Sequence, residues 1–474
     1  MTPAAATMPR VGLLPLARPT FDVAYAGQIL TEALNLLDGL DAEVVGPREL
    51  LFDAEAVRGA LPGLQAEPLD LLLILQVTFT DATMTVAAAE AIDAPIALWA
   101  FPEPRTGGRL RLNSLCGVNL AAHALGRAGE DCAWLLRDAD DARATSDLAR
   151  ILAGERRAGH AAGAPAEDVD TAARAKAETA RDRLAAARIG VVGEHPAGFD
   201  TCRYEPEGLA ALTGTTAEPV ALERVFAAAE AVPDDRASAL RRDLAPRVAG
   251  LETMEAAATD GTLKVYQALA DLAGAERYDG LAVRCWPEFF TERGCAACGA
   301  MSMMTDGGRP CGCEADVYGT LTSLALQAVA DDVAFMTDMV DLDVDGDTAV
   351  LWHCGLAPLA MADPQSRPHA TVHSNRRKPL LMEFPLKPGR VTVARFSQAR
   401  NRPRLVLAGG EMLRAPMAFS GTSGTIRFDR PAGEVLDTVL AEGLEHHYAF
   451  AYGEHRPALR ALAGLLDLPV LELT

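Results

Sequence analysis

The stretch LDLLLILQV, residues 69–77, decides the fold of the first part of this chain. Three more apolar runs flank it, VGLLPL (11–16), DAEVVGP (41–47) and PIALWAF (95–101), and a helix-like stretch follows each. Uninterrupted Val, Leu and Ile runs that alternate with helices are typical of parallel strands buried on both faces. The sequence therefore predicts a doubly wound α/β domain over residues 1–187, whose Ala-rich, charged end from about residue 143 forms connecting helices.

Two further changes of pattern divide the rest of the chain. A second alternation runs from RIGVVGEHP (188–196) to DGLAVRCWP (279–287) and predicts another parallel-sheet α/β domain over residues 188–330. Beyond residue 330, stretches such as VAFMTDMV (333–340), TAVLWHCG (348–355) and GRVTVARFS (389–397) are separated by Gly, Pro and Asp-Gly turns. We expect an α/β protein with two doubly wound domains and a β-rich, barrel-like C-terminal domain over residues 331–474.

The charge of the chain limits its partners. A formal charge of −21 over 474 residues opposes phosphate backbones and anionic lipid, so we expect neither nucleic acid nor a membrane as partner. No signal peptide opens the sequence and no apolar run reaches the length of a membrane span, which predicts a cytoplasmic protein. Its nine cysteines fit free thiols in a reducing compartment.

Residues 376–414 are a local exception, since they contain ten basic side chains against Glu383 and Glu411 and carry a formal charge of +8. A charge run of this kind is most often a solvated face or a contact with an acidic neighbouring subunit. The alternative is an anion-binding role.

Four stretches in the second half carry candidate site residues. Glu314 and Asp316 sit in a turn that feeds a helix with apolar positions Leu321, Leu324, Ala325 and Ala328, and carboxylates there either cap the helix or serve a site. Asp338 lies among apolar neighbours in a predicted strand, where an unpaired carboxylate is costly to bury.

Histidines complete this set of candidates. His353 ends the next strand, across a predicted hairpin turn at Asp345-Gly346, and so is expected near Asp338. Of the consecutive His446 and His447, alternation along an extended segment allows one to face the site while the other contacts substrate or backbone. Two carboxylates with imidazoles make a mixed oxygen and nitrogen site suited to Mn²⁺, Mg²⁺ or Co²⁺.

A zinc site is the competing metal hypothesis. Cys295-x-x-Cys298 and Cys311-x-Cys313 resemble a four-thiolate site, but the second pair is one residue closer than the usual spacing. Four neighbouring cysteines are also compatible with small buried hydrophobic residues.

Several of these motifs together resemble the L-fucose and L-arabinose isomerase superfamily, in particular its fucose-isomerase-like branch. The resemblance covers the last 190 residues or so and rests on six runs: Cys285-Trp-Pro287, Cys313-Glu-Ala-Asp316, Phe335-Met-Thr-Asp338, Leu351-Trp-His-Cys-Gly355, Glu383-Phe-Pro-Leu-Lys-Pro-Gly-Arg390 and Glu445-His-His-Tyr448. It implies two α/β domains, a β-rich third domain, and trimers or hexamers in which a neighbour's N-terminal domain closes each site.

The resemblance also implies the chemistry. Glu314, Asp338 and His447 match the metal ligands of the family, and His353 matches an additional histidine of the arabinose-isomerase branch. Glu314 and Asp338 are then the catalytic carboxylates of an aldose–ketose isomerase, which transfers a proton between C1 and C2 of an open-chain sugar through a cis-enediol. Arg18, His446 and Asp316 are the predicted substrate contacts. Mn²⁺, Mg²⁺ or Co²⁺ is the implied cofactor.

The substrate remains open among L-fucose, the arabinoses and sulfoquinovose, a sulfonated sugar that divergent members of the family isomerise. The basic side chains Arg376, Arg377 and Lys378 favour an anionic substituent. A non-catalytic sugar-binding sensor is the competing function, since two successive α/β domains also occur in such proteins; it predicts no third, β-rich domain.

Overall fold

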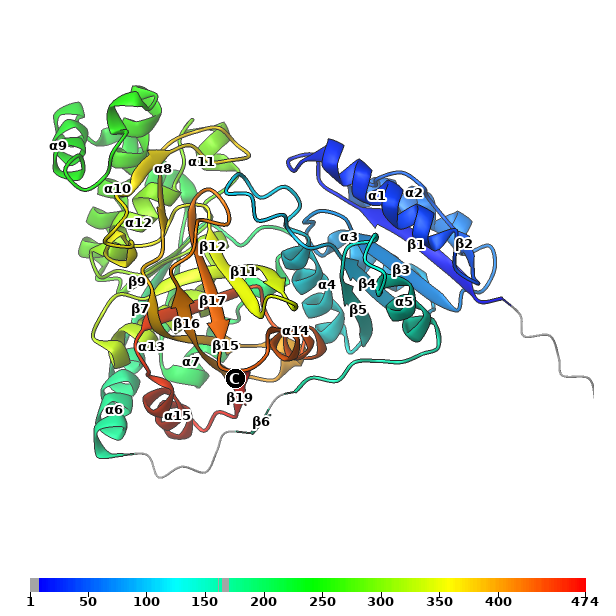
Figure 1. Cartoon of the computed structure of the whole chain (residues 1–474). Coiled ribbons are helices and arrows are strands. Elements are labelled where there is room, and N and C mark those ends of the chain that lie inside the picture. Colours follow the sequence, from blue (N-terminus) through cyan, green and yellow to red (C-terminus); the bar gives the residue numbers. More distant parts are fainter. Residues whose placement is uncertain (1–7, 161, 164–169) are drawn as a thin grey trace, which may run out of the picture.

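The computed structural model describes residues 8–160, 162–163 and 170–474. Figure 1 shows the first α/β domain, blue to cyan, on one side of a β-barrel and the green helices of the second on the other. No helix among the described residues combines the length and the apolar character that crossing a membrane requires.

The first domain is built on a parallel sheet of strand order β2-β1-β3-β4-β5. Its strands are β1 (Arg10–Leu16), β2 (Glu43–Val45), β3 (Leu71–Gln76), β4 (Ile96–Ala100) and β5 (Cys132–Leu136). Helices α1 (Val23–Leu37) and α5 (Ala144–Leu152) pack on one face, and α2 (Ala54–Leu64), α3 (Thr83–Ala91) and α4 (Ser114–Ala128) on the other. The strand order reverses between β1 and β3, which opens a crevice at the carboxyl ends of these strands.

The second domain repeats this plan with a parallel sheet of order β10-β9-β7-β8. Its strands are β7 (Arg188–Val192), β8 (Thr216–Val220), β9 (Gly280–Val283) and β10 (Cys311–Gly312). One face holds α6 (Thr171–Ala186), α7 (Pro206–Thr213) and α13 (Val317–Ala330), and the other α8 (Leu222–Ala231), α10 (Ala256–Glu276) and α12 (Cys298–Asp306). The short α11 (Glu288–Thr291) follows β9, and α9 (Asp234–Leu244) packs on α10.

The third domain is a barrel. Its ring runs β17-β12-β11-β18-β15-β16, and pairing of β16 with β17 closes it. The strands are β11 (Phe335–Asp343), β12 (Thr348–His353), β15 (Gly389–Ser397), β16 (Arg404–Leu413), β17 (Thr422–Phe428) and β18 (His447–Tyr452). Four short strands extend the sheet, β13 (His369–Thr371) and β14 (Leu381–Pro385) beyond β17, and β19 (Val470–Glu472) and β6 (Ala162–Gly163) beyond β16. Helices α14 (Ala432–Ala441) and α15 (Arg456–Leu465) complete the domain.

Two helices join the α/β domains to the barrel. Helix α4 packs against β11, and α13 packs against β15 and β18. The predicted fold class is confirmed, with two parallel-sheet domains followed by a β-rich domain. The predicted boundaries at residues 187 and 330 stay predictions; α6, just before the first of them, packs against α13 and α15.

Candidate active site

A pocket lies where the three domains meet. Arg18 and Phe79 follow the carboxyl ends of β1 and β3 in the first sheet, and Trp286 and Glu314 follow those of β9 and β10 in the second. Asp338 and His353 reach the pocket from β11 and β12 of the barrel. Carboxyl ends of parallel strands are where α/β proteins place their ligands, and here two such edges face one another.

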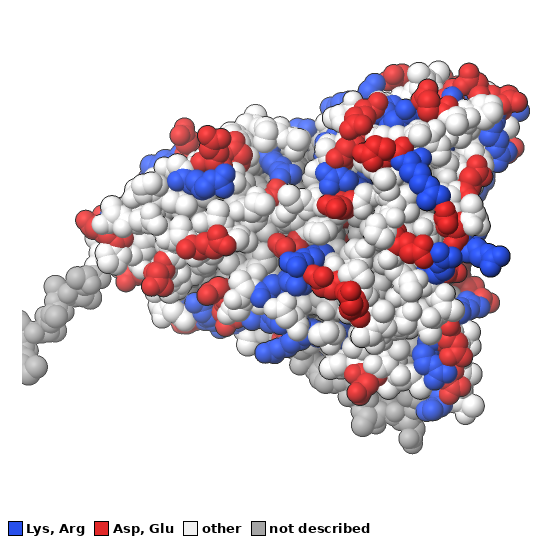
Figure 2. Space-filling model, turned by 180° about the vertical axis from the view of Figure 1, so that it is seen from behind, with Lys and Arg blue, Asp and Glu red and all other residues white. Residues whose placement is uncertain are grey.

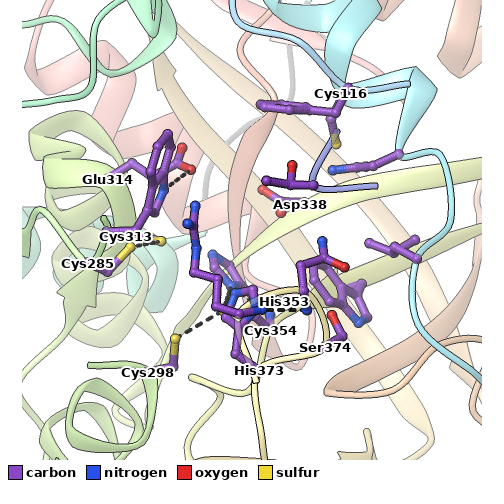
Figure 3. A pocket seen from close by; sticks show the side chains of 18 of the residues that line it. Cys116, Cys285, Cys298, Cys313, Glu314, Asp338, His353, Cys354, His373 and Ser374 are labelled. Atoms are coloured by element: carbon purple, nitrogen blue, oxygen red, sulfur yellow. Dashed lines mark hydrogen bonds between the residues drawn. The ribbon is translucent and has the colours of Figure 1, made fainter. Parts of the chain in front are cut away.

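Glu314 is held in an unusual backbone conformation. Its φ of 55° and ψ of 28° lie in the left-handed region, which costs a residue with a Cβ on the order of 1 kcal/mol. Trp286 Nε1 donates a hydrogen bond to Glu314 Oε1 at 3.0 Å, and His446 Nε2 lies 3.2 Å from Oε2. Figure 3 shows Glu314 at one wall of the pocket with the indole hydrogen bond drawn. Strain maintained by such fixed contacts is typical of functional sites.

The barrel brings Asp338 and His353 together as the sequence predicts. Strands β11 and β12 form the expected hairpin, in which Asp338 is opposite Trp352 on β12 and His447 on β18. Asp338, His353 and His447 each offer a ligand atom within 4.8 Å of the others. Asp338 Oδ1 is 3.2 Å from His447 Nε2.

His446 and His447 lie side by side next to Glu314, although only His446 lines the pocket. His447 is the first residue of β18 and His446 lies in the bend before it, so strand alternation does not separate them. Their ring centroids are 3.9 Å apart. His447 Nε2 is 3.7 Å from the carboxylate oxygen of Glu314 that His446 also contacts.

Asp316 is placed differently from its predicted role as a substrate contact. Its side chain is fully buried and does not line the pocket. Its oxygens accept from the backbone N–H of Gly319 at the start of α13 and from Arg395 Nη1 at 2.6 Å, and they contact His447 Nδ1 at 2.9 Å. We therefore revise the assignment: Asp316 caps the helix and orients His447, whereas Glu314 beside it faces the pocket.

These contacts orient two imidazole rings. His447 Nδ1 faces the Asp316 carboxylate and donates to it, so that Nε2 points toward Glu314 and Asp338. His353 has the opposite arrangement, since its Nδ1 accepts the backbone N–H of Cys354 at 2.9 Å. Its Nε2 therefore carries the proton and has no hydrogen-bond partner among the described residues.

The remaining predicted contact, Arg18, lines the pocket and forms an ion pair with Asp81. Glu314, Asp338, His353, His446 and Arg18 thus all line one cavity, with His447 directly behind Glu314 and Asp338.

Known proteins resemble the chain over almost its whole length. The model of the "Fucose/sulfoquinovose isomerase, N-terminal domain" family matches residues 12–153. A sulfoquinovose isomerase of Alkalicoccus urumqiensis is 30% identical over 467 residues, 97% of this chain and 98% of the relative. A sulfoquinovose isomerase of Priestia aryabhattai is 29% identical over 96% of this chain and 97% of the relative. One of Clostridium sp. (strain MSTE9) is also 29% identical, over 97% of this chain and 98% of the relative.

The chain belongs to the fucose isomerase-like family. It is an aldose–ketose isomerase, and the sensor hypothesis is set aside.

The pKa values of the two carboxylates of this fucose isomerase-like site shift in opposite directions. Burial raises the pKa of Glu314, but the hydrogen bond with His446 and the proximity of His447 outweigh it, so that the pKa falls below its usual value. For Asp338, burial dominates and raises the pKa to about 7. Burial also lowers the pKa of His353 well below its usual value, reinforced by His447 and His446, which keeps that ring neutral.

Thiols in this fucose isomerase-like chain do not form the four-cysteine site considered above. Cys313 lies 2.9 Å from Cys285, and Cys298 lies 3.2 Å from Cys354, sulfur to sulfur (Figure 3). Within the described part of the chain, no group of metal-ligating atoms includes Cys295, Cys298, Cys311 or Cys313. The zinc hypothesis is therefore not supported.

Sequence reasoning missed two residues of this fucose isomerase-like site. Trp286, in the run Cys285-Trp286-Pro287, received no role although it follows a strand end and holds Glu314. Arg395 was counted only within the basic segment, yet its apolar neighbours in GRVTVARFS were a sign of a buried strand position. Only 1% of Arg395 is exposed.

Proposed function

We propose that this chain is a divalent-metal-dependent isomerase that interconverts a sulfonated aldose, sulfoquinovose, and its ketose. One observation carries the metal requirement. Glu314 and Asp338 both approach one nitrogen of His447, with carboxylate oxygens 3.7 Å and 3.2 Å from Nε2, while the other ring nitrogen, Nδ1, contacts Asp316 at 2.9 Å. Three such donors at close quarters repel one another unless a proton or a cation lies between them.

The residues present fit a metal ion. Asp338 Oδ1 is buried and accepts no hydrogen bond of good geometry in the described part of the chain. Glu314, Asp338 and His447 would hold the ion, and the mixed oxygen and nitrogen set suits Mn²⁺, Mg²⁺ or Co²⁺. A bound ion supplies Lewis acidity, which stabilises negative charge on the sugar oxygens O1 and O2. His353, with its proton on Nε2, serves as a hydrogen-bond donor instead of the predicted ligand.

The two carboxylates move the proton. Glu314, whose lowered pKa keeps it ionised, removes the proton from C2 of the open-chain aldose, and a proton is returned at C1 to give the ketose. Asp338 takes the complementary role and passes the hydroxyl proton of O2 to O1, which becomes the hydroxyl of the ketose while C2 becomes its carbonyl carbon; the two carboxylates exchange roles in the reverse direction. Trp286 and His446 hold Glu314 in place, so little reorganisation is needed when the substrate arrives.

The substrate assignment rests on the relatives, which are named sulfoquinovose isomerases and align end to end with this chain. The test is a panel of sulfoquinovose, L-fucose, L-arabinose and D-arabinose incubated with the purified protein in D₂O and followed by NMR. We expect ketose from sulfoquinovose, with solvent deuterium at C1, because the proton passes through an exchangeable carboxyl group. Turnover of another sugar in the panel without turnover of sulfoquinovose would contradict the substrate assignment. Complete transfer of the substrate's C2 proton to C1 of the ketose, with no solvent deuterium, would argue against the carboxylate mechanism.

Metal binding should depend on pH. Since burial raises the pKa of Asp338 to about 7, Mn²⁺ must displace a proton from it below that pH, and above it the carboxylate is already ionised. The apparent affinity of metal-stripped protein should thus fall by about tenfold per pH unit below pH 7 and level off above it. Calorimetric titration between pH 5.5 and 8 measures this. An affinity that stays constant over that range would rule out Asp338 as the group that titrates.

A further inference from the structure

One cation at the pocket has no acidic partner within residues 8–160, 162–163 and 170–474. Arg376 lies in the loop between β13 and β14 and lines the pocket, half-buried. Its guanidinium carbon is 5.0 Å from the ring centroid of Trp286 and 5.2 Å from that of Phe290. Two aromatic faces therefore hold the guanidinium in position, and its N–H groups have no hydrogen-bond acceptor among the residues that the structure describes.

Comparison with neighbouring cations sets Arg376 apart. Arg18, the other arginine of the pocket, is neutralised by Asp81. Most basic side chains of the 376–414 segment form ion pairs: Lys378 with Glu255, Arg390 with Asp429 and Glu454, Arg395 with Asp316, Arg400 with Asp131, Arg404 with Glu442, and Arg414 with Asp363. Arg376 has no carboxylate partner in the part of the chain that the structure describes.

The segment is therefore not the continuous basic face that its composition suggested. On the side of the molecule drawn in Figure 2, acidic and basic side chains are intermingled. A chain of net charge −21 repels an anionic substrate at long range. The positive charge of Arg376 inside the pocket offsets this repulsion locally and attracts an anionic group.

Arg376 and the catalytic Glu314 contact the same tryptophan. The indole of Trp286 contacts both the Arg376 guanidinium and, through Nε1, the Glu314 carboxylate. Figure 3 shows His373 and Ser374, from the loop that carries Arg376, across the pocket from Glu314 and Asp338. A sugar whose C1–C2 end lies at the carboxylates thus extends its far end toward this loop.

We propose that Arg376 binds the anionic group at C6 of the substrate, a sulfonate, and thereby sets the specificity of the enzyme. This inference rests on the proposed function and adds the residue that recognises the charged end. A sulfonate is ionised at every physiological pH and offers oxygens that match the planar guanidinium fork, as phosphate oxygens do. A sulfonate carries one charge and a phosphate close to two, so one unpaired arginine favours the former.

The test compares two variants, Arg376→Met, which keeps the length and removes the charge, and Arg376→Lys, which keeps the charge and removes the fork. The measured quantity is the ratio of kcat/KM for sulfoquinovose to kcat/KM for its uncharged 6-deoxy analogue, quinovose, with glucose 6-phosphate as a third substrate. We expect the ratio to fall by about 10²-fold in Arg376→Met and by less in Arg376→Lys. Arg377→Met, which changes the exposed neighbour, is the matched control and should keep the wild-type ratio.

Inhibition provides a second readout that does not require turnover of quinovose. Ethanesulfonate should compete with sulfoquinovose, and its inhibition constant should rise by about tenfold or more in Arg376→Met, because the inhibitor presents the charged group alone. Equal losses on both sugars, or unchanged inhibition, would overturn the assignment while leaving the isomerase intact. A wild-type preference for glucose 6-phosphate would assign the site to phosphate. Failure of wild-type protein to isomerise sulfoquinovose would instead refute the proposed function.

Discussion

Replacement Glu314→Gln should lower kcat by about 10²–10⁴-fold, the usual contribution of a positioned general base. The amide keeps an oxygen that can accept from Trp286 Nε1, so the local structure should persist while the base and one metal-binding oxygen are lost. Steady-state kinetics with sulfoquinovose, together with an unchanged circular dichroism spectrum, measure the effect.

The control for this variant is Glu292→Gln, an exposed glutamate in the segment that follows Trp286. It should retain wild-type kinetics because its side chain is solvated. Glu314→Gln protein with more than about a tenth of wild-type kcat would refute the assignment of Glu314 as the base.

Replacement Arg395→Met should have the largest effect on stability, a loss of about 3–5 kcal/mol, because it leaves a buried carboxylate without its counter-ion. Arg395 and Asp316 are 1% and 0% exposed, and Arg395 Nη2 also donates to the carbonyl of Thr201 at 3.0 Å. Gly319 accommodates the pair, since a Cβ there would lie 2.7 Å from Asp316 Oδ2 and 3.0 Å from Arg395 Nη1. Urea unfolding monitored by fluorescence measures the loss.

A second substitution separates lost charge pairing from lost packing. Adding Asp316→Asn to Arg395→Met removes the unpaired charge but keeps a side chain that caps α13 equally well, so the double variant should regain part of the stability. Arg174→Met serves as the surface control. Its pair with Glu178 is exposed, and its loss should cost no more than about 0.5 kcal/mol. A double variant less stable than Arg395→Met would show that packing, not charge, dominates.

The fold was largely predictable because its signals are local. The run of residues 69–77 became β3, the central strand of the first sheet, and the Asp-Gly turn at Asp345-Gly346 joined β11 to β12. Strands that depart from these patterns escaped prediction: β8, Thr216–Val220, contains a proline and alternates weakly, as expected at the edge of a sheet.

The site was predictable in its residues but not in its geometry. Spacing identified both Glu314 and Asp316 but not which of them faces the pocket, because that depends on the left-handed backbone at Glu314 and on Arg395, 79 residues away in sequence from Asp316. The tautomers of His353 and His447 depend on hydrogen bonds from Cys354 and to Asp316, which no sequence pattern encodes. The expected homo-oligomer and its shared site stay predictions.

The most direct test of the central claim is the isomerisation of sulfoquinovose by metal-stripped protein, before and after addition of Mn²⁺. The approach of both Glu314 and Asp338 to His447 Nε2 predicts no ketose from stripped protein and restored turnover with about one Mn²⁺ per chain. The same addition should restore nothing to Glu314→Gln. Full turnover by protein shown by elemental analysis to contain no metal would contradict the account.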